Sequence, residues 1–176
     1  MQSFSYSNST KYAEFYKMLE GLGYGLFCFF LPFLLSHSQQ QLIVGTLVNA
    51  MLVLSAIRLR MRYSMPAIFL PSLGVVSAGM LFGNLTQYLI LLVPFIWIGN
   101  FALVSVFKKM SRRPFHIRAL SAAALKASLL SIATFALVLF SLVPSALLVP
   151  MSLVQFVTAL SGSALAFAML KGLKLA

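Results

Sequence analysis

Six apolar stretches divide this chain of 176 residues, and short polar stretches separate them. A helix rises about 1.5 Å per residue, so roughly 20 apolar residues cross the ~30 Å hydrocarbon core of a bilayer. The pattern therefore predicts an all-α bundle of six transmembrane helices. Their expected ranges are residues 21–35, 42–57, 65–82, 88–107, 119–143 and 146–170.

Residues 1–20 differ from the rest of the chain because residues 1–10 are rich in Ser and Asn and an amphipathic pattern begins at Lys11. Tyr12, Phe15 and Leu19 recur at helical spacing, which predicts an amphipathic turn or two at the membrane interface. We therefore expect an N-terminal segment followed by a single transmembrane domain over residues 21–176.

Basic residues occur in four clusters, at residues 11–17, 58–62, 108–126 and 171–174. Charge thus follows every second apolar stretch, and the alternate turns contain no Lys, Arg, Asp or Glu. Cytoplasmic loops of membrane proteins are enriched in Lys and Arg. The pattern predicts a multi-pass protein of the inner (cytoplasmic) membrane with both termini in the cytoplasm.

The composition excludes a soluble domain, because only 9% of the residues are charged and 61% are hydrophobic. Soluble domains carry about 25% charged residues. The net charge of +11 does not indicate nucleic-acid binding, since the basic residues flank separate spans rather than form one stripe. We expect them to meet anionic lipids on the cytoplasmic side.

Catalytic and metal-binding chemistry has few residues available. The carboxylates are Glu14 and Glu20, both near the N-terminus, and the lone Cys28 excludes an internal disulfide. No cluster of His, Cys, Asp and Glu has the spacing of a metal site. We expect a protein that is not an enzyme and has no metal or cofactor.

Lys126 lies about two turns inside the fifth predicted span. A Lys side chain near a helix end can extend toward the interface and place its ammonium in water. We expect this arrangement, with a role inside the bundle as the alternative. In either case, the external loops and their flanks carry no charge.

Neutral polar and aromatic side chains are therefore the candidates for recognition. They are His37, Gln40, Asn49, Asn84, Gln87, Tyr88, Trp97, Asn100 and Gln155. Amides in hydrocarbon need hydrogen-bond partners. One interpretation is that they join helices to one another. The other is an externally open pocket with an aromatic wall of Trp97 and Tyr88, suited to a small neutral or partly aromatic solute.

Small residues at four-residue spacing mark faces on which helices pack closely. Gly21 and Gly25 form one such pair in the first span, and Ala119, Ala123 and Ala127 form a row in the fifth. These faces pack within the bundle or dock a partner membrane subunit, and the sequence leaves both interpretations open.

The segments LPSLGVVSAGMLFG (residues 70–83) and PFIWIGN (residues 94–100) add a resemblance. With the six spans and the cytoplasmic termini, they resemble the substrate-binding S components of energy-coupling factor transporters, or a related group of small prokaryotic membrane proteins. The resemblance implies capture of a micronutrient by the outer loops and outer helix halves. It also implies docking, through small residues such as Gly21 and Gly25, on a transmembrane coupling subunit driven by ATPase subunits.

The function expected from the sequence is a solute-binding membrane component of a multi-subunit transporter. Two alternatives remain: a membrane scaffold or assembly subunit without transport, and a small oligomeric channel lined by the same amides.

Overall fold

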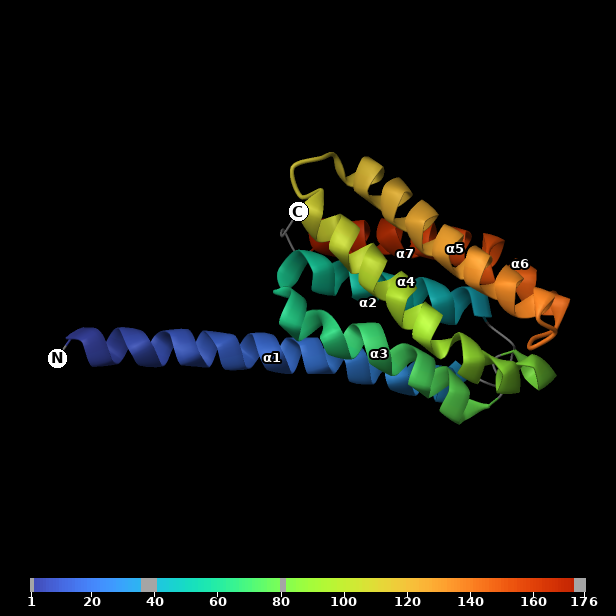
Figure 1. The fold of residues 1–176 in the computed structure, drawn as a ribbon. Coiled ribbons are helices and arrows are strands. Elements are labelled where there is room, and N and C mark those ends of the chain that lie inside the picture. Colours follow the sequence, from blue (N-terminus) through green and yellow to red (C-terminus); the bar gives the residue numbers. More distant parts are fainter. Residues whose placement is uncertain (1, 36–40, 80–81, 173–176) are drawn as a thin grey trace.

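The computed structural model describes residues 2–35, 41–79 and 82–172, and all regular structure in this part of the chain is helical. The prediction of an all-α fold is confirmed at this level (Figure 1). The helices are α1 (Gln2–Leu35), α2 (Gln41–Arg58), α3 (Met61–Ala78), η2 (Gly83–Tyr88), α4 (Leu89–Lys109), α5 (Phe115–Leu139), η3 (Ser145–Leu147), α6 (Leu148–Met151) and α7 (Leu153–Gly172).

Among the described residues, five segments are long and apolar enough to cross a membrane. They are Tyr12–Leu35, Gln41–Arg58, Gly83–Lys109, Phe115–Leu139 and Ser145–Gly172. The helix α3 is not among them, and its 18 residues include Arg62 and two prolines. The chain is thus a helical protein with several potential membrane spans, and a sixth crossing by α3 stays a prediction.

The helix α1 is continuous from Gln2 to Leu35, so the expected N-terminal segment and the first span form one helix. Figure 1 shows its N-terminal part extending well beyond the bundle. The buried positions of α1 include Gly21, Gly25, Cys28 and Leu31, which recur at helical spacing. This stripe faces α3 and fixes α1 on one side of the bundle.

Glycines allow α1 and α3 to approach until their backbones touch. A Cβ atom at Gly21 would lie 2.0 Å from the carbonyl oxygen of Tyr63, and one at Gly25 would lie 2.6 Å from Cβ of Pro66. Farther along the pair, a Cβ atom at Gly74 would lie 2.2 Å from the carbonyl oxygen of Phe29. No larger residue fits these positions unless the helices separate.

A second close pair is formed by α2 and α7. A Cβ atom at Gly162 of α7 would lie 2.6 Å from the carbonyl oxygen of Thr46, and one at Gly45 of α2 would lie 2.9 Å from Cγ2 of Thr158. The helix α4 crosses between the two pairs and contacts α2, α3 and α5. The hydrophobic core therefore lies around α2 and α4, where Leu52 and Leu103 are fully buried.

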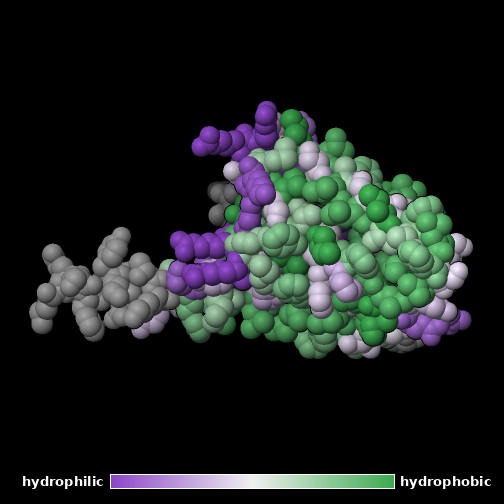
Figure 2. Space-filling view, in the orientation of Figure 1, coloured by the Kyte–Doolittle hydropathy of each residue, from purple (hydrophilic) through white to green (hydrophobic). Residues whose placement is uncertain are grey.

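The basic segments meet at one end of the bundle. The α2–α3 connection, the α4–α5 connection and the C-terminal end of α7 all lie at the left in Figure 1. Figure 2 shows hydrophilic residues at the two ends of the molecule and hydrophobic residues across the face between them. We call the end with residues 58–62 and 108–118 the basic end. Basic residues of separate connections thus lie at the same end of the bundle, and the side of the membrane that this end faces stays a prediction.

The connection between α2 and α3 is short, and side chains satisfy the carbonyl groups exposed there. Lys108 of α4 donates hydrogen bonds to the carbonyl oxygens of Ala56, at 3.0 Å, and of Leu59. Ser64 of α3 donates to the carbonyl oxygen of Ser55, at 3.1 Å. The last carbonyl groups of a helix lack partners within the helix, so these contacts join α2, α3 and α4 at the basic end.

The last predicted span, at residues 146–170, is interrupted, and the hydropathy pattern does not predict this break. The short helix α6 ends at Met151, and Ser152 adopts φ −115° and ψ −86° before α7 begins at Leu153. The fifth span is also displaced, since α5 covers Phe115–Leu139 rather than residues 119–143. Ser141, with a left-handed φ of 56°, follows its C-terminal end.

Candidate functional site

A cavity of about 70 Å³ lies among α2, α3, α4, α5, α6 and α7. This volume is large enough for several water molecules. It is smaller than the roughly 300–1,000 Å³ of a pocket for a drug-sized ligand. The walls include the first halves of α2, α4 and α7 and the last half of α3, so the cavity lies in the half of the bundle away from the basic end. Its polar lining residues are Gln41, Asn49, Ser72, Asn100, Lys126, Gln155 and Thr158.

Lys126 lines this cavity from the middle of α5, with 2% of its surface exposed. Its ammonium donates a hydrogen bond of 2.7 Å to Oδ1 of Asn49 on α2. The expectation that Lys126 extends to the cytoplasmic interface is therefore wrong. The side chain lies on the face that α5 buries, together with Ala122 and Ala123 one turn earlier, and so it points across the bundle.

A glycine on α4 makes room for the Lys126 side chain. A Cβ atom at Gly99 would lie 3.3 Å from Cγ of Lys126, which is tighter than an ordinary van der Waals contact. The apolar part of the lysine thus packs against the backbone of α4, while its charged end reaches α2. A lysine within a membrane span usually faces the bundle interior or a cavity in this way.

Asn49 connects Lys126 to α7 through a chain of hydrogen bonds. The amide nitrogen of Asn49 donates to the carbonyl oxygen of Gly45 at 2.8 Å and to Oγ1 of Thr158 at 3.3 Å. Thr158 in turn donates to the carbonyl oxygen of Gln155 at 3.2 Å. These contacts use both amide protons of Asn49, so its carbonyl oxygen is turned toward the ammonium.

Two buried polar atoms at the cavity have no hydrogen-bond partner in the part of the chain that the structure describes. Asn100 donates through Nδ2 to the carbonyl oxygen of Ile68 at 3.0 Å, but its Oδ1 is unpaired. Nε2 of Gln41 is also unpaired. Because buried polar atoms are nearly always hydrogen-bonded, these two atoms indicate a place for a polar guest.

Three of the residues predicted to bind solute are brought together: Asn49, Asn100 and Gln155 all line the cavity. Others lie apart from it. Asn84 and Gln87 are exposed on η2, and Tyr88 ends that helix without lining the cavity. The predicted positions His37 and Gln40 lie outside the described residues.

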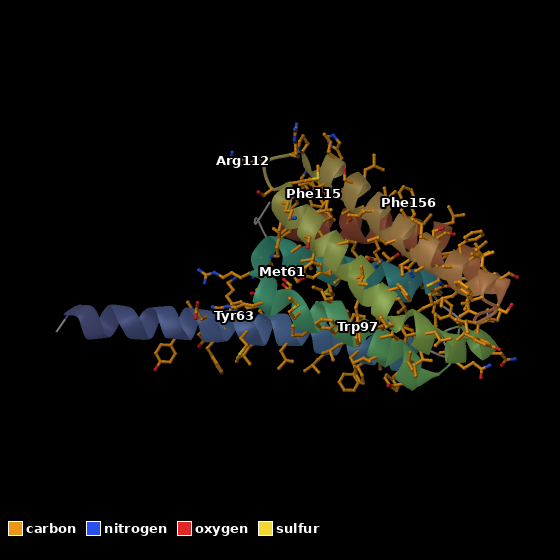
Figure 3. The ribbon with its side chains drawn as sticks, viewed as in Figure 1. Met61, Tyr63, Trp97, Arg112, Phe115 and Phe156 are labelled. Carbon is orange, nitrogen blue, oxygen red and sulfur yellow. The ribbon has the colours of Figure 1, made fainter. Side chains whose placement is uncertain are left out.

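The predicted aromatic wall is absent from the described cavity lining. Trp97 of α4 faces α3 instead (Figure 3), and Nε1 donates to Oγ of Ser72 at 2.7 Å and to the carbonyl oxygen of Phe69 at 3.1 Å. The indole ring packs edge-on against the ring of Phe69, with centroids 5.1 Å apart. Trp97 therefore supports the α3–α4 contact behind the cavity, and Phe82 is the aromatic residue in the described lining.

The residues predicted to dock a partner are buried within this chain. Gly21 and Gly25 contact α3, as described above. Ala119 and Ala123 belong to the main hydrophobic core, and Ala127 is buried on the same face of α5. The interpretation as packing inside the bundle describes these five residues, and docking through them is not retained.

Sequence reasoning missed Lys126, Gln41, Ser72 and Thr158 as cavity residues. For Lys126 a signal was present, because it follows Ala119, Ala122 and Ala123 at helical spacing and so lies on the small-residue face. Small residues mark the packed side of a helix in a membrane protein. Gln41, Ser72 and Thr158 have no such signal in the sequence. They line the cavity because α2, α3 and α7 pack around it.

Both side-chain carboxylates of the chain lie at the basic end. Glu14 forms ion pairs with Arg62, at 2.6 Å, and Arg60, at 3.3 Å. Glu20 pairs with Arg58 and with Lys17, and it accepts a hydrogen bond from Tyr24 at 2.8 Å. Among the described residues no group of His, Cys, Asp and Glu is arranged to hold a metal ion. The cavity offers hydrogen bonds and one ammonium group.

In comparisons with known proteins, the chain matches no protein-family model, no curated protein and no solved structure. The resemblance to S components stays a prediction based on the sequence. The class that the structure defines is coarser: a helical protein with several potential membrane spans and a polar cavity within its bundle.

Proposed function

We propose that this chain is a solute-binding membrane component of a multi-subunit transporter. One observation carries the proposal: a polar cavity, lined by Lys126, Asn49 and Asn100, within a bundle whose core is mostly apolar. Binding sites of membrane transporters characteristically combine buried polar groups with interrupted helices near the middle of the bilayer. The interruption at Ser152 between α6 and α7 lies beside the cavity residues Met151 and Gln155.

The proposed orientation follows the charge distribution. The basic end faces the cytoplasm, where Lys and Arg are enriched in membrane proteins and meet anionic lipids. In this proposal α3 completes a sixth crossing beside α1 and α4, and both termini are cytoplasmic. The cavity then lies in the external half of an inner-membrane protein, where it receives solute from outside.

Energy for transport would come from other subunits. The sequence contains no Gly-rich loop followed by Lys and Ser or Thr, the pattern that cradles nucleotide phosphates. By analogy with S components, a transmembrane coupling subunit and ATPase subunits would supply the movement. Because the small residues of α1 and α5 are used inside the bundle, such a subunit would dock on another face.

Native mass spectrometry of the gently purified full chain tests the proposal. We expect the purified wild-type protein to carry a small molecule that it bound in the cell. The cavity variant Gln155→Leu should carry less of this molecule. The exposed Gln87→Leu serves as the matched control and should retain it normally. A protein that carries no solute under any extraction condition would favour the scaffold alternative. Ion conductance by a symmetric oligomer in a planar bilayer would favour the channel.

A further inference from the structure

The ammonium group of Lys126 is not neutralised by any side-chain carboxylate. The whole chain contains two acidic residues, Glu14 and Glu20, and both pair with basic side chains at the basic end. The described partner of Lys126 is the neutral amide oxygen of Asn49. A buried cation without a counter-ion is costly in a medium of low dielectric constant, so burial favours either a neutral amine or an anion beside the ammonium group.

The ammonium also has unused hydrogen-bonding capacity. It carries three donors, and the bond to Asn49 uses one of them. Nε2 of Gln41, eight positions before Asn49 on α2, is a further lining donor without a partner among the described residues. The two oxygens of a carboxylate accept several hydrogen bonds, and they match this excess of donors.

Asn100 adds the opposite requirement. Its unpaired Oδ1, on a side chain that is 1% exposed, can only accept a hydrogen bond. A guest that satisfies the cavity therefore carries one hydrogen-bond donor as well as an anionic group. The volume of about 70 Å³ limits it to a short molecule.

From these features we infer that the cavity binds a short-chain hydroxycarboxylate, with the carboxylate on Lys126 and the hydroxyl group on Asn100. The inference rests on the proposed function in treating the cavity as a solute site, and it adds the chemical class of the solute. It replaces the neutral, partly aromatic solute expected from the sequence, because the cavity lining contains a lysine and lacks Trp97.

Three probes of similar size separate the charge from the hydroxyl group: lactate, its neutral amide lactamide, and propionate, which lacks the hydroxyl group. Binding is measured by calorimetry on the full chain in detergent micelles. We expect lactate to bind most tightly, propionate more weakly and lactamide very weakly. Lactamide binding as tight as lactate would overturn the inference, and so would chloride or nitrate binding more tightly than lactate. Equal affinity for lactate and propionate would overturn the role of Asn100.

Variants test whether the binding occurs in this cavity. Lys126→Met should weaken lactate binding about 30-fold or more, as expected when one partner of a buried charge pair is removed. Lys109→Met removes an exposed basic residue outside the cavity and should leave the affinity unchanged. Unchanged affinity in Lys126→Met would refute the assignment.

A second variant distinguishes a loss of lactate binding from a loss of folding. Asn49→Asp keeps an acceptor beside Lys126 and supplies an internal counter-ion, but it removes the amide donor to Gly45 and Thr158. Circular dichroism therefore checks that the variant is folded, and the folded variant should not bind lactate. Retained binding in Asn49→Asp would count against the inference. If none of the probes binds but native mass spectrometry finds another retained solute, the hydroxycarboxylate is wrong while the proposed function stands. If lactate binds but no uptake system uses the chain, the hydroxycarboxylate site stands and the proposed transport function is wrong.

Discussion

Lys126 on α5 and Asn49 on α2 are joined by a hydrogen bond of 2.7 Å between residues 77 positions apart in the sequence. The bond crosses the centre of the bundle and connects a cation to a network that continues to Thr158 on α7. It therefore links three helices by polar contacts in an interior that is mostly apolar.

Removing Asn49 should destabilise the protein because Lys126 loses its described partner. We expect Asn49→Leu to lower the free energy of unfolding by about 1.5–3 kcal/mol, the range for a hydrogen bond to a charged group. Unfolding is followed by circular dichroism in mixed micelles. In the double variant with Lys126→Met the loss should be smaller than the sum of the two single losses. Additive losses would contradict the coupling.

The contact of α1 with α3 should be sensitive to single methyl groups. Gly25→Ala places a Cβ atom 2.6 Å from Cβ of Pro66, so we expect a loss of about 1–3 kcal/mol from overpacking. Gly23→Ala is the matched control, because nothing lies within 4 Å of its added Cβ atom. That variant should be neutral or stabilised by up to about 1 kcal/mol through helix propensity. Equal effects at the two positions would argue against the contact.

We expect Lys108 to contribute more to the stability of the basic end than Lys109 does. Lys108→Met removes the donors for the carbonyl oxygens of Ala56 and Leu59, and the expected cost is about 1–3 kcal/mol. Lys109 is exposed, so Lys109→Met should change stability by less than about 0.5 kcal/mol. Thermal unfolding of the two variants, measured side by side, checks the difference.

The orientation can be tested by labelling introduced cysteines, because the native Cys28 has no exposed surface and gives little background. Ser111→Cys, in the α4–α5 connection, should react with a membrane-impermeant maleimide only after cells are opened. Asn84→Cys, on η2, should react in intact cells. The opposite result at both positions would reverse the proposed topology.

Trp97 should matter for helix packing and little for solute affinity. Trp97→Phe removes the hydrogen bonds to Ser72 and Phe69, so we expect a loss of about 1–2 kcal/mol in stability. The dissociation constant of any cavity ligand should change by less than about threefold, a difference near 0.6 kcal/mol. A larger effect, measured by calorimetry, would place the indole ring at the solute.

The sequence was sufficient to predict most of the helices. Hydropathy places the second span at residues 42–57, and α2 covers Gln41–Arg58. It places the fourth at residues 88–107, and α4 covers Leu89–Lys109. These predictions succeed because apolar length and flanking charge are local properties of the chain.

The cavity was only partly predictable from the sequence, since it depends on which helix faces pack against one another. Asn49, Asn100 and Gln155 could be identified because amides within apolar spans are rare enough to stand out. The direction of Lys126 and of Trp97 could not be derived from their depth in a span. Each follows from a neighbouring helix: Gly99 of α4 leaves space for the lysine, and Phe69 and Ser72 of α3 bind the indole ring.

The glycine contacts also determine how the walls of the cavity are built. They hold α1 against α3 and α2 against α7 as two closely packed pairs. The cavity takes Ser72 and Val75 from the first pair and Asn49 and Thr158 from the second, so its polar groups lie along the seam between the pairs. A substitution that separates the helices of either pair would therefore displace one wall of the cavity without altering any residue of its lining.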